Sequence, residues 1–135
     1  MKTIVRMVDV PINDWNNQTK GTVTLEISDG EFVLLLGPNG SGKSYLLNLM
    51  AALRVPRVGE VFLEGKRLTK MSERQKRAWR AGLGLIPSDP VLLNGYTVLE
   101  GLVLTAQLLG KSAADAKRNA LESCLLYTSP SPRDA

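Results

Sequence analysis

The residues best suited to chemistry form one short glycine-rich segment: Gly37, Pro38, Asn39, Gly40, Ser41, Gly42, Lys43 and Ser44. Its G-x-x-x-x-G-K-S pattern is typical of loops whose backbone N–H groups surround the phosphates of a nucleotide. Glycine accepts positive φ angles and lets the backbone approach an anion closely. Lys43 can place its charge against the β- and γ-phosphates, and the Ser44 hydroxyl is a suitable Mg²⁺ ligand. The segment therefore predicts binding of a nucleotide together with Mg²⁺.

The flanks of this segment support that interpretation. An apolar run, residues 32–36, leads into it, and a run with helical character, residues 45–53, leaves it. A strand, a loop and a helix in this order are the context in which a phosphate-binding loop is expected. The alternative is a glycine-rich turn that joins a strand to a helix and binds nothing. The match of both flanks favours phosphate binding.

The elements that must position this loop are predicted from apolar periodicity and from turn and cap residues. Residues 3–10 and 21–28 alternate apolar and polar side chains, as strands do, and residues 11–20 are expected to form a loop. Asp29-Gly30 predicts a hairpin turn into a strand at 32–36. Further along the chain we expect a hairpin that joins 60–63 to 66–68, and a short strand at 83–86. Three helices are also predicted: one from Ser72 to about Arg80, one from Thr97 to Gly110 and one that begins at Ser112. The order indicates an antiparallel β region followed by an α/β part, in one domain.

Composition and charge exclude several kinds of site. The chain of 135 residues has no histidine, and its only cysteine is Cys124, so a disulfide framework, a thiolate metal site and histidine catalysis are excluded. The net charge is +4, with the basic residues densest between 66 and 80. This stretch could bind nucleic acid or anionic lipid, but it lacks a series of interleaved aromatic side chains for base stacking. The solvated face of a surface helix is favoured, and no nucleic-acid partner is predicted.

The last residues differ in kind from the rest of the chain. Residues 124–134, CLLYTSPSPRD, match the translation of a sequencing-library transposon adapter at all eleven positions. Composition alone would suggest an ordinary Ser/Pro-rich disordered tail. We expect residues 124–135 to be an adapter-derived disordered tail and the natural sequence to continue beyond Ser123.

Several segments together resemble the N-terminal half of the ATP-binding subunit of an ABC transporter. Besides the glycine-rich loop, these segments are Asp29-Gly30-Glu31-Phe32, Gly59-Glu60-Val61-Phe62-Leu63-Glu64-Gly65, Leu92-Leu93 and Thr97-Val98-Leu99-Glu100. Residues 68–80 are most similar to the lipoprotein-release and macrolide-export subgroup. The resemblance implies an α/β fold with an incomplete P-loop NTPase core over residues 1–123, and ATP with Mg²⁺ as ligands.

The resemblance also implies roles for three further residues. Trp15 lies 28 residues before Lys43, about the family spacing for the aromatic side chain that stacks on adenine; local packing of a loop tryptophan is the alternative. Ser88 stands where the family has a glutamine that contacts Mg²⁺ and the attacking water, and its shorter side chain needs a bridging water to reach the metal; Asp89 is the neighbouring alternative. Tyr45 stands where the family usually has threonine, and its ring either crowds the α-phosphate or packs inward.

The resemblance finally implies the setting in which the chain works. The family's signature loop, Walker B carboxylates and switch histidine are expected beyond Ser123, so this chain holds a binding half-site without its catalytic half and no catalytic residue is assigned in it. The expected partners are a second ATP-binding subunit and a transmembrane permease, at the cytoplasmic face of the cell membrane. Two functions stay open: an ATPase subunit that couples hydrolysis to transport, and a regulatory or scaffolding subunit that binds ATP but hydrolyses it weakly.

Overall fold

The chain divides into two compact units, whereas the sequence predicted one domain. The computed structural model describes residues 1–13, 16, 18–89 and 92–128. One unit comprises residues 1–85 and the other residues 86–135. The predicted phosphate-binding loop belongs entirely to the first unit, so that unit carries the site.

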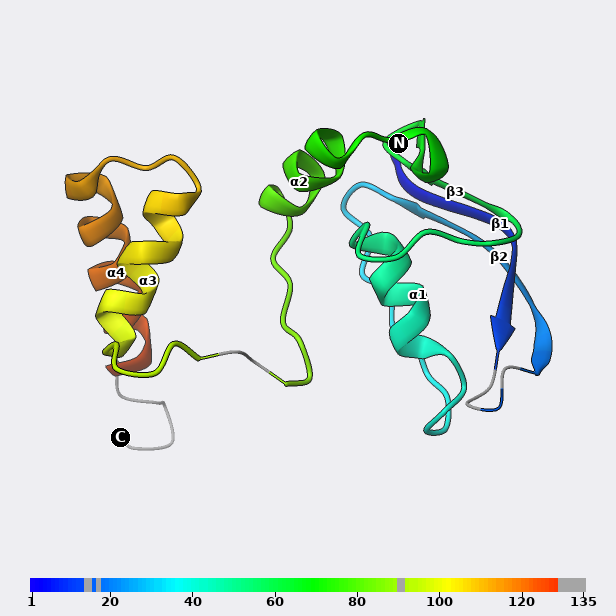
Figure 1. Cartoon of the computed structure of the whole chain (residues 1–135), viewed down its shortest axis with the longest axis horizontal. Helices are drawn as coiled ribbons and strands as arrows, with labels where there is room; N and C mark the ends of the chain where they lie inside the picture. Colours follow the sequence, from blue (N-terminus) through cyan, green and yellow to red (C-terminus); the bar gives the residue numbers. More distant parts are fainter. Residues whose placement is uncertain (14–15, 17, 90–91, 129–135) are drawn as a thin grey trace. The chain divides into compact units, whose positions relative to one another are not determined.

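The first unit is built on a four-stranded antiparallel sheet (Figure 1). Its strands are β1 (Thr3–Asn13), β2 (Thr19–Ser28), β3 (Glu60–Leu63) and β4 (Lys66–Arg67), in the order β2-β1-β3-β4. Both strands predicted at the N-terminus are present. Because β1 extends to Asn13 and β2 begins at Thr19, the loop between them is shorter than the predicted 11–20. Glu64 and Gly65 have φ angles of 46° and 78°, which suits the two-residue turn between β3 and β4.

Strand β1 contains a β-bulge at Asp9 that the sequence did not predict. Met7 pairs with Leu25, but Val10 pairs with Val23, so β1 has one more residue than β2 in this interval. Asp9 has a φ of 49°, and its N–H donates to the Thr24 hydroxyl at 3.0 Å. The extra residue reverses which residues of β1 face the core, because side chains alternate along a strand.

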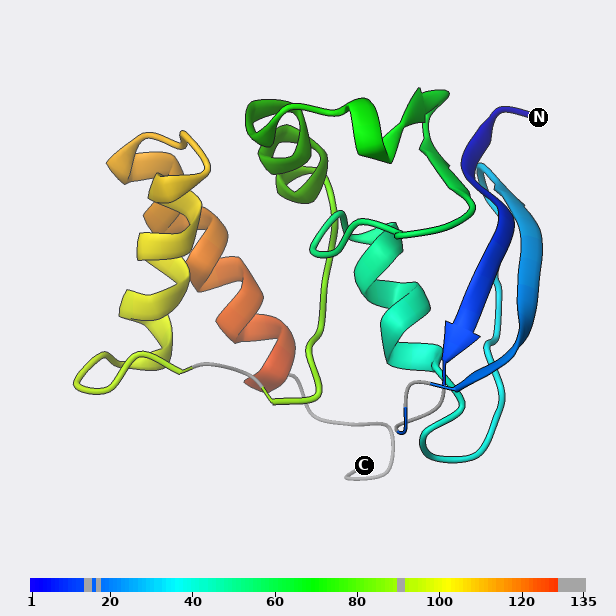
Figure 2. The same cartoon turned by 45° about the vertical axis from the view of Figure 1, so that its right-hand side comes forward.

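Helix α1 (Lys43–Met50) covers one face of this sheet (Figure 2). Leu46 and Leu49 are buried, and they pack in one cluster with side chains of β1 and β3. The main buried members of the cluster are Val5, Met7, Val10, Leu46, Leu49, Val61, Leu63 and Leu68. The core of the unit therefore lies directly beneath the helix that follows the glycine-rich loop.

A 3₁₀ helix, η1 (Leu68–Lys70), leads into helix α2 (Glu73–Ala81), which Ser72 caps as predicted. Ser72 accepts from Gln75 N–H, and the Gln75 side chain accepts in return from Ser72 N–H. The Lys76 ammonium donates to the Glu73 carboxylate at 3.0 Å and lowers the pKa of that carboxyl. Helix α2 buries no residue completely, so it lies on the surface of the unit.

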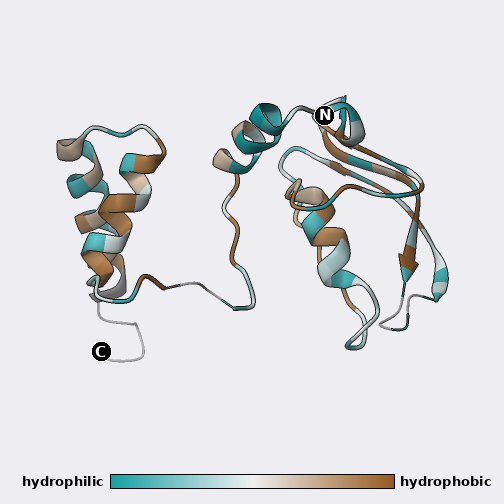
Figure 3. Cartoon of the chain, viewed as in Figure 1, coloured by the Kyte–Doolittle hydropathy of each residue, from teal (hydrophilic) through white to brown (hydrophobic). Residues whose placement is uncertain are grey.

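Two predicted strands, residues 32–36 and 83–86, are not formed. Both segments are irregular, and the exposed fractions of Phe32 and Ile86 are 92% and 95%. The second segment appears in Figure 3 as an apolar trace leaving α2. Continuous apolar runs become strands when neighbouring strands pair with them and layers cover both faces. No strand among the described residues pairs with either segment, so their apolar character alone does not produce a strand.

The second unit is a pair of helices, α3 (Val98–Leu108) and α4 (Ala113–Thr128), packed against each other. Thr97 caps α3 as predicted and forms a reciprocal pair with Glu100, and Ser112 accepts from Asp115 N–H at the start of α4. Helix α4 continues through Thr128, so the first five residues of the segment predicted as an adapter-derived tail, 124–128, are helical. Within the described residues, no helix combines the length and apolar character needed to cross a bilayer.

Candidate phosphate-binding site

The glycine-rich segment is irregular from Gly37 to Gly42, and its last two residues, Lys43 and Ser44, are the first two residues of α1. Gly40 and Gly42 have φ angles of 77° and 96°, values that side chains with a Cβ rarely adopt. Ser41 N–H donates to the Pro38 carbonyl at 3.2 Å and closes a turn inside the loop. The loop thus has the irregular, glycine-dependent course that a phosphate cradle requires.

Two of its glycines are also required by close contacts. A Cβ on Gly37 would lie 2.7 Å from Ser41 Oγ, and a Cβ on Gly42 would overlap Cγ2 of Ile12. The space beside each of these two glycines is therefore taken by a neighbouring side chain, which a Cβ would have to displace.

Lys43 and Ser44 are the first two residues of α1, directly after the glycine-rich loop. The Lys43 ammonium donates to the carbonyls of Gly37 and Pro38, the second at 2.7 Å, and lies 3.3 Å from Ser41 Oγ. Ser44 is exposed in the first turn of α1. No side chain caps this helix, so its first N–H groups remain available to an anion, for which a helix N-terminus is a favourable position.

These observations fit a bound nucleotide phosphate with Mg²⁺. The loop glycines and the start of α1 would hold the phosphate oxygens, Lys43 would supply the positive charge, and the Ser44 hydroxyl would ligate the metal. When bound, Mg²⁺ neutralises part of the phosphate charge. Among the described residues, no group of three or more Asp, Glu, His or Cys side chains forms a further metal site.

The three residues singled out by the family pattern have different outcomes. Tyr45 is half-buried and packs against the core cluster, which is the inward-packing alternative. Ser88 is exposed in a bend of the second unit, and its role stays a prediction. Trp15 lies outside the described residues.

A cavity of about 280 Å³ lies between the loop and the strand hairpin. Ile12, Lys20, Gly21 and Thr22 line it on the hairpin side, and residues 38–41 line it on the loop side. No role for Ile12 or Lys20 could be predicted from the sequence. Neither stands in a motif, and only the fold brings the end of β1 to the loop.

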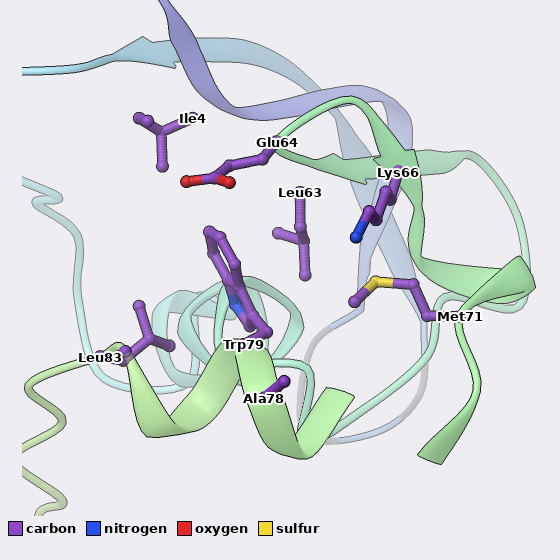
Figure 4. Close-up of a pocket in the computed structure, with 9 residues that line it drawn as sticks. Ile4, Leu63, Glu64, Lys66, Met71, Ala78, Trp79 and Leu83 are labelled. Carbon is purple, nitrogen blue, oxygen red and sulfur yellow. The ribbon is translucent and has the colours of Figure 1, made fainter. Parts of the chain in front are cut away.

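A second cavity, of about 400 Å³, lies on another side of the same unit (Figure 4). Trp79 of α2 points into it, together with Ile4, Leu63 and Leu83, while Glu64 and Lys66 are the charged residues of its lining. The Trp79 indole N–H donates to the Met50 carbonyl at 2.7 Å. This cavity shares no lining residue with the one beside the loop, so the two are separate sites.

Comparisons with known proteins agree with this geometry. Residues 21–128 match the protein family described as ABC transporter. The chain is 37% identical, over 99 residues, to the lipoprotein-releasing system ATP-binding protein LolD of Xanthomonas oryzae pv. oryzae. This alignment covers 73% of the chain and 41% of LolD. An uncharacterized ABC transporter ATP-binding protein of Thermotoga maritima is 32% identical over 127 residues, covering 90% of the chain and 54% of that protein.

Solved structures give the same result for the fold. The ATP-binding cassette MJ0796, in a dimeric post-hydrolysis state bound to ADP and Pi, matches with a TM-score of 0.76 at 27% identity. The match covers 98% of this chain and 60% of that one, which confirms the α/β fold class. The chain spans about half the length of the curated relatives it matches. With most of its residues matched, the chain belongs to the ABC transporter family and is part of an ATPase domain of that family.

Proposed function

We propose that this chain binds Mg-ATP through Gly37–Ser44 as part of an ATPase subunit that couples ATP hydrolysis to transport. The observation that carries the proposal is the loop itself: Gly40 and Gly42 are left-handed, a Cβ on Gly37 or Gly42 would clash with a neighbouring side chain, and Lys43 donates to loop oxygens. A relative of known structure binds ADP and Pi. Trp15 is proposed to stack on the adenine.

The partners and the limits of the domain belong to the same proposal. MJ0796 is dimeric and LolD is part of a lipoprotein-releasing system; these properties support a second ATP-binding subunit and a membrane permease as partners. The subunit would then work at the cytoplasmic face of a membrane. We assign residues 1–123 to the ATP-binding domain and residues 124–135 to an adapter-derived tail.

The simplest test is stabilisation of the 135-residue chain by Mg-ATP in thermal unfolding. A ligand at about one hundred times its dissociation constant adds about 2.7 kcal/mol to the free energy of unfolding. Lys43→Ala should remove most of this stabilisation, because it deletes the charge that faces the phosphates.

Lys70→Ala is the matched control, since it removes an exposed lysine from η1, away from the loop. Its stabilisation by Mg-ATP should equal that of the unaltered chain. Equal stabilisation of the Lys43→Ala variant would refute the proposal.

A weakly hydrolysing subunit is the second candidate, and Ser88 is the observation that favours it. A serine is shorter than the glutamine expected by family resemblance, so it holds metal and water less directly. In a parent protein of the length of its relatives, Ser88→Gln should raise the rate of hydrolysis. A tenfold gain corresponds to about 1.4 kcal/mol of activation free energy. An unchanged rate in both Ser88→Gln and Ser88→Ala would remove position 88 from the mechanism.

A further inference from the structure

The end of β1 touches the phosphate-binding loop through one side chain. Ile12 Cγ2 lies where a Cβ of Gly42 would be, so the isoleucine methyl is in close contact with the loop backbone. Ile12 also lines the 280 Å³ cavity opposite Pro38, Asn39 and Gly40. It is half-buried and packs against the core cluster. Ile12 therefore joins the rigid core to the last glycine before Lys43.

The Asp9 bulge is what places Ile12 on this face. Val5 and Met7 are buried before the bulge, and Val10 is buried after it. Without the extra residue, an alternating strand would direct Pro11 toward the core and Ile12 away from it. The bulge thus brings a β-branched side chain, which has few rotamers, beneath Gly42.

Two neighbours hold the bulge in place. Asp9 N–H donates to Thr24 Oγ1, and the Thr24 hydroxyl in turn lies 3.4 Å from the Asp9 carboxylate. Gly59 approaches so closely that a Cβ there would lie 2.5 Å from the Asp9 carbonyl oxygen. The bulge at Asp9 therefore requires a glycine at position 59. Neither the bulge nor this close approach can be predicted from the alternation of apolar and polar residues.

We propose that Ile12, set inward by the Asp9 bulge, is a positioning residue for the phosphate-binding loop. Its γ2 methyl supports the left-handed backbone of Gly42 and so fixes the direction of the N–H groups at the start of α1. Hydrogen bonds weaken steeply when donor and acceptor are misaligned, so a small rotation of these N–H groups weakens their bonds to an anion. Ile12 does not itself contact the phosphates, and its effect on ligand binding rests on the proposed function.

Three variants at two positions test whether Ile12 acts on the loop backbone or only through its packing in the core. Ile12→Val keeps the γ2 methyl, whereas Ile12→Leu keeps the volume but moves the branch away from Gly42. Ile4→Leu makes the same change on the same strand, at a half-buried side chain that packs against the same core but lies among the residues of the other cavity. The probe is magnesium pyrophosphate, which supplies phosphates without a base, titrated calorimetrically into the 135-residue chain.

Ile12→Leu is expected to weaken pyrophosphate binding about tenfold, the effect of losing about one hydrogen bond, while Ile12→Val and Ile4→Leu bind like the unaltered chain. Urea unfolding of each variant shows whether stability changes in parallel. Binding by Ile12→Leu at unaltered affinity, or an equal loss in Ile4→Leu, would overturn the proposal.

A second readout needs no ligand, so it keeps this role distinct from nucleotide binding. Backbone amide NMR signals of Gly40, Gly42 and Lys43 should shift in Ile12→Leu and remain in place in Ile12→Val and Ile4→Leu. If the unaltered chain binds no pyrophosphate, the proposed function fails, and these signals still decide the role of Ile12. Unshifted loop signals in Ile12→Leu would refute it.

Discussion

Gly42 combines two constraints that can be separated by mutation. Its φ of 96° is unfavourable for any residue with a Cβ, and that Cβ would also overlap Ile12. Gly30 has a similar φ of 80° in the turn after β2, but a Cβ there would have nothing within 4 Å. The pair therefore distinguishes backbone strain from steric overlap.

Gly30→Ala is expected to lower the free energy of unfolding by about 1–2 kcal/mol, the cost of a left-handed alanine. Gly42→Ala should cost about 1–3 kcal/mol more, because the new methyl must displace Ile12 or the loop. Urea unfolding of both variants gives the difference directly. Equal losses would show that the loop yields freely at Gly42.

At the scale of elements, helix α2 is attached to α1 by two side chains that donate to backbone carbonyls. Trp79 donates to Met50, and Arg80 Nη1 donates to the Ala52 carbonyl at 2.6 Å. Met50 is the last residue of α1 and Ala52 follows its C-cap, so both carbonyls lie near the C-terminus of this helix, where a positive charge is favourable. Helix α2 buries no residue completely, so these two hydrogen bonds contribute to holding it on the unit.

Trp79→Phe keeps an aromatic ring but removes the donor, and Arg80→Ala removes the cation. Each should lower the free energy of unfolding by about 1 kcal/mol, since a partly buried carbonyl loses its partner. Arg74→Ala, an exposed arginine of the same helix, is the control and should change little. Chemical denaturation followed by circular dichroism measures all three. A loss in Arg74→Ala as large as in the other two would mean that general charge, not these contacts, holds α2.

Elements were predictable from sequence where local chemistry determines them. Ser72 and Thr97 cap helices by contacts within one turn, and Glu64-Gly65 forms the predicted hairpin turn between β3 and β4. Asp29-Gly30 forms a turn but not the predicted hairpin, because no strand follows it at 32–36. The strands at 32–36 and 83–86 failed because a strand needs neighbours, which an apolar run does not supply. The Asp9 bulge was missed because it depends on Gly59, fifty residues away in the sequence.

The candidate site was predictable to the same extent. The loop residues could be predicted from a motif. The role proposed for Ile12 could not, because it depends on a β-bulge that reverses which side chains of β1 face the core, and no local sequence pattern indicates that bulge. Tyr45 shows the converse case, since its motif position left two orientations open and packing against the core selects one.

On the scale of the whole molecule, the nucleotide loop and its supporting core belong to one compact unit, and Ser88 belongs to the other. We expect the 135-residue chain to bind Mg-ATP without hydrolysing it, because no cluster of acidic or histidine side chains in the described part of the chain could position metal and water together. Release of inorganic phosphate should equal that of the Lys43→Ala variant. Turnover above that background would show that the chain contains a complete catalytic site.

The contacts of Lys43 have a consequence for the speed and entropy of binding. A lysine side chain loses up to about 2 kcal/mol of rotamer entropy when it is fixed. Here three loop oxygens already hold the ammonium group. The rotamer entropy of Lys43 is therefore lost when the chain folds, before any anion binds. A phosphate then meets an ordered cation and needs only to exchange oxygen partners with it. The exchange of these oxygen partners, rather than the ordering of the lysine side chain, should therefore limit how fast the anion is captured.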